Sequence, residues 1–201
     1  MKYLEKIQTL LPLGYLYLIL LGLLDESIQY YQLGINILNF SSITDILLRP
    51  IAEMFSGPIL LIVSISFFLL LFVIQNFIVQ QVYKNRNRKI LGRIRYNETT
   101  SKKEIKKAIF PIFILFFAFE LLTIFVGIGL GGGEKIAKAI KTKNFTYNYR
   151  VNFSSGKTED VYLFDMNSLY YFYTTKDSNN IKIAPVGSIN SLELINNKKL
   201  K

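Results

Sequence analysis

Three long apolar runs, each of about 20 residues with almost no charged side chain, limit what this chain can fold into. A helix needs about that length to cross about 30 Å of hydrocarbon at a rise of about 1.5 Å per residue. A soluble domain of 201 residues could bury a composition that is 51% hydrophobic, but here the apolar residues are gathered into separate runs. We therefore predict three transmembrane helices, at about residues 4–24, 58–79 and 109–130.

After the third run the pattern changes from long apolar stretches to short alternating segments. Five such segments, separated by turn residues, follow Asn144 and predict five β-strands. A meander of this size avoids unpaired edges by closing into a barrel. The predicted fold class is a membrane α domain followed by a small all-β domain, built as a five-stranded barrel or meander. The predicted parts are a transmembrane domain (1–133), a basic connector (134–143) and the small β domain (144–201).

The segment between the first two spans, residues 25–57, is mixed in character. Asp25 and Glu26 are expected to end the first span, and Ser42 with Asp45 resembles a capping box that opens a short helix. Because Pro50 interrupts that helix, it is too short to cross. We interpret it as an amphipathic element that is interfacial or partly re-entrant, and an ordinary packed loop is the alternative.

The charge of the chain is concentrated in one loop. The net charge is +10, yet residues 84–108 alone carry ten basic and two acidic residues, or +8. Lysine and arginine near the ends of spans are retained on the cytoplasmic side. The basic residues of this loop are Lys84, Arg86, Arg88, Lys89, Arg93, Arg95, Lys102, Lys103, Lys106 and Lys107.

The apolar runs predict a cell-membrane protein. The heavy use of Ile, Lys, Asn, Tyr and Phe resembles that of a bacterium with an AT-rich genome, so we expect the inner membrane. Charge bias then predicts that the N-terminus and the basic loop are cytoplasmic. Residues 25–57 hold four acids against Arg49 alone, which suits the opposite side. Three crossings then place the C-terminal domain outside, although the four lysines of residues 134–143 weigh against this. The loop also suits anionic lipid or an acidic partner, and we predict no specific nucleic-acid binding.

The absence of Cys and His excludes whole classes of chemistry. Neither thiolate nor imidazole is available for nucleophilic catalysis, zinc binding or haem ligation. Glu159, Asp160 and Asp165 are clustered acids, but acids at strand ends are usually solvated. We predict no catalytic residues, no metal, no cofactor and no enzymatic activity.

Two features of the third span are candidate sites. Glu120 places a carboxyl group near mid-bilayer, which costs at least about 2.5 kcal/mol when ionised and is consistent either with a proton or cation site or with a hydrogen bond that holds helices together. A glycine cluster follows it and suits close helix packing in an oligomer or a hinge before the β domain. Its members are Gly127, Gly129, Gly131 and Gly133.

The β domain resembles the Sm and SH3-like small barrels. The resemblance lies in a glycine-bearing hairpin (Val151–Gly156), a bent second strand (Val161–Asn167) and a short turn before the last strand (Ile183–Leu194), in that order. It covers about a quarter of the chain and implies a small barrel. The RNA-binding residues of Sm proteins are not carried over, since a matching basic strand-turn motif is missing.

Two functions are consistent with this architecture. The first is a non-enzymatic membrane protein: a homo-oligomeric anchor or sensor, or an accessory subunit of a larger bacterial membrane or defence system, in which the β domain engages a protein partner. The second is an oligomeric ion channel or pore, because three helices followed by an Sm-like domain resemble the order in small-conductance mechanosensitive channels. The bulky third span, the outward bias of the β domain and the missing C-terminal vestibule depart from that family.

Overall fold

A computed structural model describes residues 2–84, 101–178 and 180–195. Backbone contacts divide the chain into two compact units. Unit 1 combines Met1–Ile51 with Phe125–Lys201, and unit 2 is Ala52–Ile124. Each unit is described by itself below.

Three helices are long and apolar enough to cross a membrane, as the sequence predicts. They are α1 (Lys2–Tyr31), α3 (Pro58–Lys84) and α4 (Lys102–Thr142), and a shorter helix, α2 (Ile43–Ser56), lies between the first two. Many large apolar side chains of the long helices are exposed. Ile59 in α3 and Leu115 in α4, for example, are 76% and 71% exposed. Such surfaces suit contact with lipid chains rather than water.

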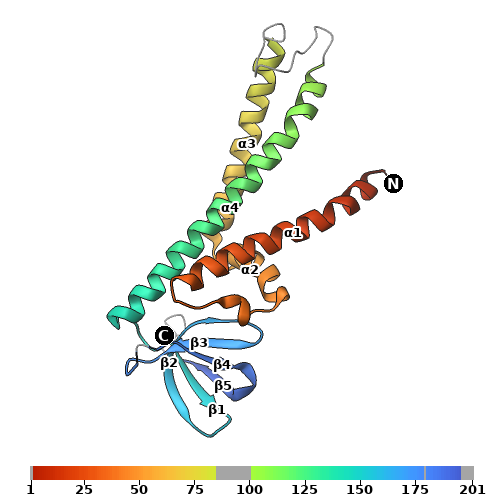
Figure 1. Cartoon of the computed structure of the whole chain (residues 1–201). Helices are drawn as coiled ribbons and strands as arrows, with labels where there is room; N and C mark the ends of the chain where they lie inside the picture. The colour runs from red at the N-terminus through yellow and green to blue at the C-terminus, as the bar shows by residue number, and fades with distance from the viewer. Residues whose placement is uncertain (1, 85–100, 179, 196–201) are drawn as a thin grey trace. The chain divides into compact units, whose positions relative to one another are not determined.

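Unit 2 is an antiparallel helical hairpin of α3 and the first half of α4 (Figure 1). Val79, Val82, Ile105 and Ile109 form its buried cluster, and Phe117 packs against Phe68 with ring centroids 5.3 Å apart. A capping box opens α4, because Ser101 and Glu104 each accept a hydrogen bond from the other's backbone N–H.

The β domain in unit 1 is a five-stranded antiparallel open sheet of order β4-β3-β2-β1-β5. All five strands overlap the segments that the sequence predicts, which are residues 147–153, 160–165, 169–174, 181–184 and 189–195. Between β1 and β2, Gly156 adopts φ +83° and closes a tight turn in which its N–H donates to the Phe153 carbonyl. The strands are β1 (Tyr149–Phe153), β2 (Thr158–Met166), β3 (Tyr170–Thr174), β4 (Lys182–Pro185) and β5 (Ile189–Leu194).

Each face of the sheet carries its own apolar core. One face is lined by Val151, Val161 and Leu163, which pack among themselves and against the side chains of the neighbouring strands. On the other face, fully buried Phe172 meets Tyr30 of α1, with ring centroids 5.0 Å apart at an angle of 63°. The sheet therefore packs directly against the end of α1 (Figure 1).

The helices differ from the sequence prediction at three places. Asp25 and Glu26 do not end α1, which continues to Tyr31, and both carboxylates pair with a basic residue described below. Pro50 lies within α2 without interrupting it. The basic connector, residues 134–143, is helical almost to its end, since α4 runs on to Thr142.

Candidate functional site: a buried ionic cluster at the end of α1

Arg49 of α2 lies at the centre of a buried ionic cluster in unit 1. Its guanidinium is 2.9 Å from a carboxylate oxygen of Asp165 in β2, 3.4 Å from Asp25 and 3.9 Å from Glu26, both in α1. The Asp25 side chain is fully buried and that of Arg49 is 17% exposed. One side chain thus joins α1, α2 and the sheet, and we call these four residues the Arg49 cluster.

Local sequence explains why these groups meet. Gly22, one turn before Asp25, lets the backbone of α2 approach α1 so closely that an added Cβ would lie 1.9 Å from the Ile46 carbonyl oxygen. Arg49 follows Ile46 by three residues and therefore lies on the same face of α2. The close crossing at Gly22 places its guanidinium against the acids of α1.

Polar neighbours complete the cluster. The Tyr30 hydroxyl donates to Asp165 over 2.9 Å, and Arg49 donates to the Gln29 side-chain oxygen over 3.1 Å. Ser41 donates to Glu26 over 3.0 Å. Such bonds offset the desolvation of charges taken out of water.

The carboxylates around Arg49 stabilise the charged form of its guanidinium. Burial alone would lower the pKa of Arg49, but the charge and hydrogen bond of Asp165, followed by the charges of Asp25 and Glu26, raise it above its ordinary value. Three carboxyl groups surround one guanidinium, so the cluster is net negative when all are ionised. No group of acids suited to holding a metal ion occurs in the part of the chain that the structure describes.

A second set of polar contacts, all hydrogen bonds, joins the β2–β3 turn to the start of α2 and the residues just before it. The predicted capping box is present, since Asp45 accepts from the Ser42 N–H and Ser42 Oγ accepts from the Asp45 N–H, each over 3.1 Å. Asp45 also accepts from the Ser168 hydroxyl over 2.8 Å, and Asn167 donates to the Phe40 carbonyl over 3.0 Å. Burial would raise the pKa of Asp45, but the hydrogen bonds from Ser42 and Ser168 outweigh it and hold the pKa below its usual value.

The glycine cluster lies inside α4 and divides into two faces. An added Cβ would be 2.6 Å from the Asp25 carbonyl oxygen at Gly129 and 2.5 Å from that of Gln29 at Gly133. These two glycines let α4 pack closely on α1 within one chain. Gly127 and Gly131 have nothing within 4 Å of such a Cβ.

Glu120 is half-buried on α4 in unit 2. The Thr123 hydroxyl donates to its backbone carbonyl over 2.8 Å, not to its carboxylate. No described residue gives the Glu120 carboxylate a hydrogen bond or ion pair. The carboxyl group of Glu120 therefore lies within a long apolar helix and has no partner among residues 2–84, 101–178 and 180–195.

The basic loop is only partly within the described residues. Lys106 donates to the Asn76 side-chain oxygen over 3.2 Å and lies 4.7 Å from the Phe72 ring centroid. Lys102, Lys103 and Lys107 are exposed on the first turns of α4, and Lys84 ends α3. Outside the described residues lie Arg86, Arg88, Lys89, Arg93 and Arg95.

No family model, no curated protein and no solved structure matches this chain.

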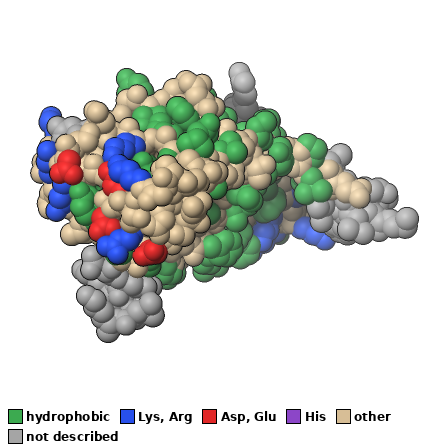
Figure 2. Space-filling model, turned by 90° about the horizontal axis from the view of Figure 1, so that it is seen from below, with side chains coloured by type: hydrophobic (Ala, Val, Ile, Leu, Met, Phe, Trp, Pro, Cys, Tyr) green, Lys and Arg blue, Asp and Glu red, His purple; other side chains and the backbone are tan. Residues whose placement is uncertain are grey.

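The outer surface of the sheet offers an open polar hollow, lined by Arg150, Glu159, Asp160 and Asp177 among others. Arg150 and Asp160 pair over 2.7 Å, and Lys182 pairs with Glu159 over 3.0 Å. Burial would raise the pKa of Glu159, but hydrogen bonds and charges from Lys182 and Lys157 keep it below its ordinary value. Figure 2, which views the model from below, shows basic and acidic side chains interspersed rather than segregated.

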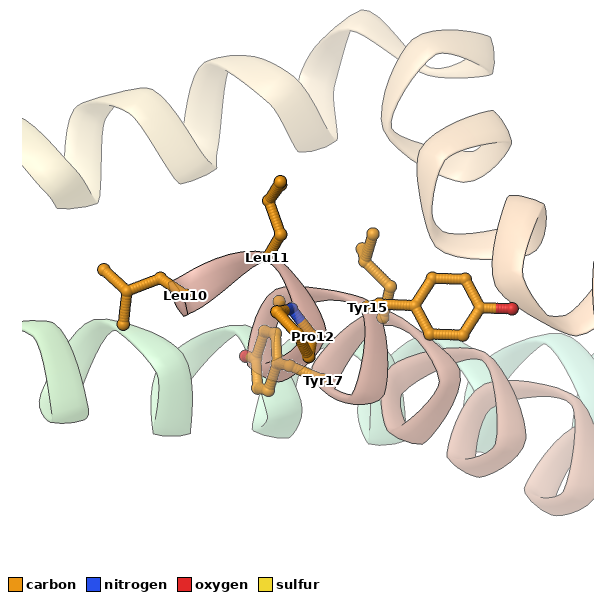
Figure 3. Close-up of a pocket in the computed structure, with 7 residues that line it drawn as sticks. Leu10, Leu11, Pro12, Tyr15 and Tyr17 are labelled. Atoms are coloured by element: carbon orange, nitrogen blue, oxygen red, sulfur yellow. The ribbon is translucent and has the colours of Figure 1, made fainter. Parts of the chain in front are cut away.

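A second, apolar hollow runs along α1 (Figure 3). Leu10, Leu11, Pro12 and Tyr15 belong to its lining, which comes entirely from this one helix. Leu10 and Leu11 are 62% and 63% exposed. This hollow is a feature of the apolar helix surface and brings no chemical groups together.

From the sequence, the members of the Arg49 cluster are separate features. The pattern predicts that Asp25 and Glu26 end a span and that Asp165 is a solvated acid, whereas the Asp165 side chain is 15% exposed and paired. A usable signal was present: Arg49 is the single basic residue of an acidic segment that also holds Asp25 and Glu26. The contribution of Asp165 came from the far end of the chain and had no such signal.

Proposed function

We propose that this chain is a non-enzymatic membrane protein: an oligomeric anchor or sensor, or an accessory subunit of a larger bacterial assembly, whose β domain binds a protein partner. The observation that carries the proposal is the Arg49 cluster. Because Arg49 joins α1, α2 and β2 at once, a displacement of the sheet acts directly on the end of the first span. The polar hollow on the sheet, with its alternating charges, suits a polar protein surface.

Packing within unit 1 supports the proposed topology. Tyr30 at the end of α1 contacts Phe172 of the sheet, which follows α4. A sheet on the same side as the end of α1 requires an even number of crossings between them, which α3 and α4 supply. Together with the basic loop, this favours a cytoplasmic N-terminus and an extracytoplasmic β domain in a bacterial inner membrane.

Three features support kinship with small Sm or SH3-like barrels. They are the hairpin glycine Gly156, an irregularity in β2 between Leu163 and Asp165, and a 3-10 turn at Val186–Ser188 just before β5. β5 also returns to pair with β1. We propose a small-barrel relative whose edge strands β4 and β5 stay unjoined within residues 149–194.

Cysteine labelling tests the proposed sidedness, because the chain has no natural Cys. A membrane-impermeant maleimide should label Ser178→Cys in intact cells and Asn97→Cys only after permeabilisation. The reverse pattern would overturn the topology. Native mass spectrometry of the full chain in detergent tests self-association, and a strictly monomeric protein would contradict the oligomer.

Hydrogen exchange tests the coupling between sheet and span. Arg49→Met is expected to raise exchange both in the last turns of α1 and in β2, because the cluster holds both elements. Arg150→Met removes an exposed ion pair and is the matched control. Faster exchange confined to α2 in the Arg49 variant would remove the sensor argument.

A pore is the second candidate, and Glu120 favours it. A carboxyl group within a span and without a described partner suits a water-lined path formed by several copies. Planar-bilayer recordings of the purified protein should show cation-selective currents that Glu120→Gln reduces. Silent bilayers at protein levels where the oligomer is present would exclude conduction.

A further inference from the structure

Unit 2 contains a buried polar group that the proposed function does not use. Gln75 of α3 is 2% exposed, and its side-chain amide nitrogen has no hydrogen-bond partner among the described residues. A buried donor left unpaired costs about 1–3 kcal/mol in a protein core, and more where hydrocarbon replaces water. An acceptor from outside the described residues would offset this cost.

Gln75 lines a small, partly open hollow of about 80 Å³ between α3 and α4. Five phenylalanines supply most of the walls, and Gln75 is the single polar side chain among the described lining residues; the five are Phe68, Phe72, Phe110, Phe113 and Phe117. A buried water needs two to four polar partners, which this hollow does not offer. An acceptor attached to an apolar chain fits it better.

A cation lies next to this hollow. Lys106 Nζ lies 4.7 Å from the centroid of Phe72, one of the lining rings, and donates to Asn76, the residue after Gln75. The ammonium group has three donors, and one of them is used by Asn76. It therefore has donors left for an anionic group at the mouth of the hollow.

The depth of Gln75 matches one part of a lipid. α3 ends at Lys84, nine residues and about 14 Å further along the helix axis. The exposed Gln80 lies between them, at the level where polar side chains reach the headgroups. Gln75 lies five residues, or about 7.5 Å, before Gln80 along the helix axis. It therefore lies just below the headgroup region, where the ester carbonyls and first methylenes of glycerolipids are found.

We propose that the hollow between α3 and α4 binds an anionic glycerophospholipid. Its ester carbonyl accepts a hydrogen bond from Gln75, its phosphate pairs with Lys106, and the start of one acyl chain lies against the phenylalanines. Basic side chains beside grooves between transmembrane helices recognise lipid headgroups by the same physics.

Binding of defined lipids to the delipidated full chain in detergent tests the proposal. Phosphatidylglycerol should bind more tightly than phosphatidylcholine, and its dialkyl ether analogue, which lacks ester carbonyls, should bind about tenfold more weakly. Gln75→Leu should weaken the ester lipid about tenfold and abolish the difference between ester and ether lipids. Lys106→Gln should reduce the preference for phosphatidylglycerol over phosphatidylcholine.

Two exposed neighbours provide matched controls, Gln80→Leu and Lys107→Gln, and neither should change lipid binding. Equal affinity of the wild-type chain for ester and ether lipids would overturn the carbonyl contact and leave a trapped water as the partner of Gln75. Equal losses in Gln75→Leu and Gln80→Leu would overturn the site itself. The test is also informative if a variant is unstable, because the comparison of the two lipids uses the wild-type chain.

Discussion

Replacing Arg49 by Met tests the physical basis of the Arg49 cluster. The substitution keeps an unbranched side chain about as long as the aliphatic part of arginine and removes the guanidinium. Fully buried Asp25 then loses the cation 3.4 Å away, and Asp165 loses the one at 2.9 Å. The α1 and β2 carboxylates would remain close together without that cation.

Removing one partner of a buried ion pair costs about 3–5 kcal/mol, because the remaining charge stays desolvated. For a chain of this size about 1 kcal/mol shifts the unfolding midpoint by about 2–4 °C. The Arg49→Met protein should therefore unfold about 6–20 °C below the wild type. Thermal unfolding of the purified full chain in detergent, followed by near-UV circular dichroism, measures this shift.

Arg150→Met is the matched control, since Arg150 and Asp160 also pair closely, at 2.7 Å, but with 45% and 37% of their side chains exposed. Water screens such a pair, so its loss should move the midpoint by no more than about 4 °C. Equal shifts in the two variants would show that burial of the Arg49 cluster has no energetic consequence. Restoration of stability by pairing Arg49→Met with Asp165→Asn would support the electrostatic account.

Three further predictions concern the surroundings of the cluster. Gly133→Ala should destabilise the chain by about 1–3 kcal/mol, because the new Cβ would lie 2.5 Å from the Gln29 carbonyl oxygen. Gly131→Ala should not destabilise it, and denaturant titration in micelles compares the two variants. Tyr30→Phe should lower the free energy of unfolding by about 1–3 kcal/mol, because it removes the 2.9 Å hydrogen bond from the Tyr30 hydroxyl to Asp165. A denaturant titration identical to that of the wild type would refute that bond. Because folding lowers the pKa of Asp45, its ionised carboxylate stabilises the fold above the unfolded-state pKa of about 3.9. This stability is lost as pH falls through the lower folded-state pKa. The unfolding midpoint of Asp45→Asn should therefore depend less on pH in acid than that of the wild type.

Local signals were sufficient for most elements of this fold. The apolar runs located three spanning helices because length and lack of charge are enough to define such a helix. Alternation and turn residues located all five strands, and Gly156 marked the first hairpin because its φ of +83° suits glycine. The capping box at Ser42 and Asp45 was likewise readable, since both partners lie within one turn.

Errors arose where a distant partner changed the meaning of a residue. Asp25 and Glu26 beside an apolar run predict the end of a span, but both acids pair with Arg49 and lie inside α1, which continues to Tyr31. Sequence spacing alone also could not divide the glycine cluster, whose Gly129 and Gly133 face α1 within the same chain.

The sequence by itself determined the apolar helices and the strand pattern, because hydrophobic length, alternation and turn chemistry act over a few neighbouring residues. Only the tertiary structure decided that Arg49, Asp25 and Asp165 form one buried cluster and that Phe172 of the sheet packs against Tyr30 of α1. The contacts of Asp165 with Arg49 and of Phe172 with Tyr30 join residues more than a hundred positions apart. The strength of an ion pair also depends on burial, which no local pattern records.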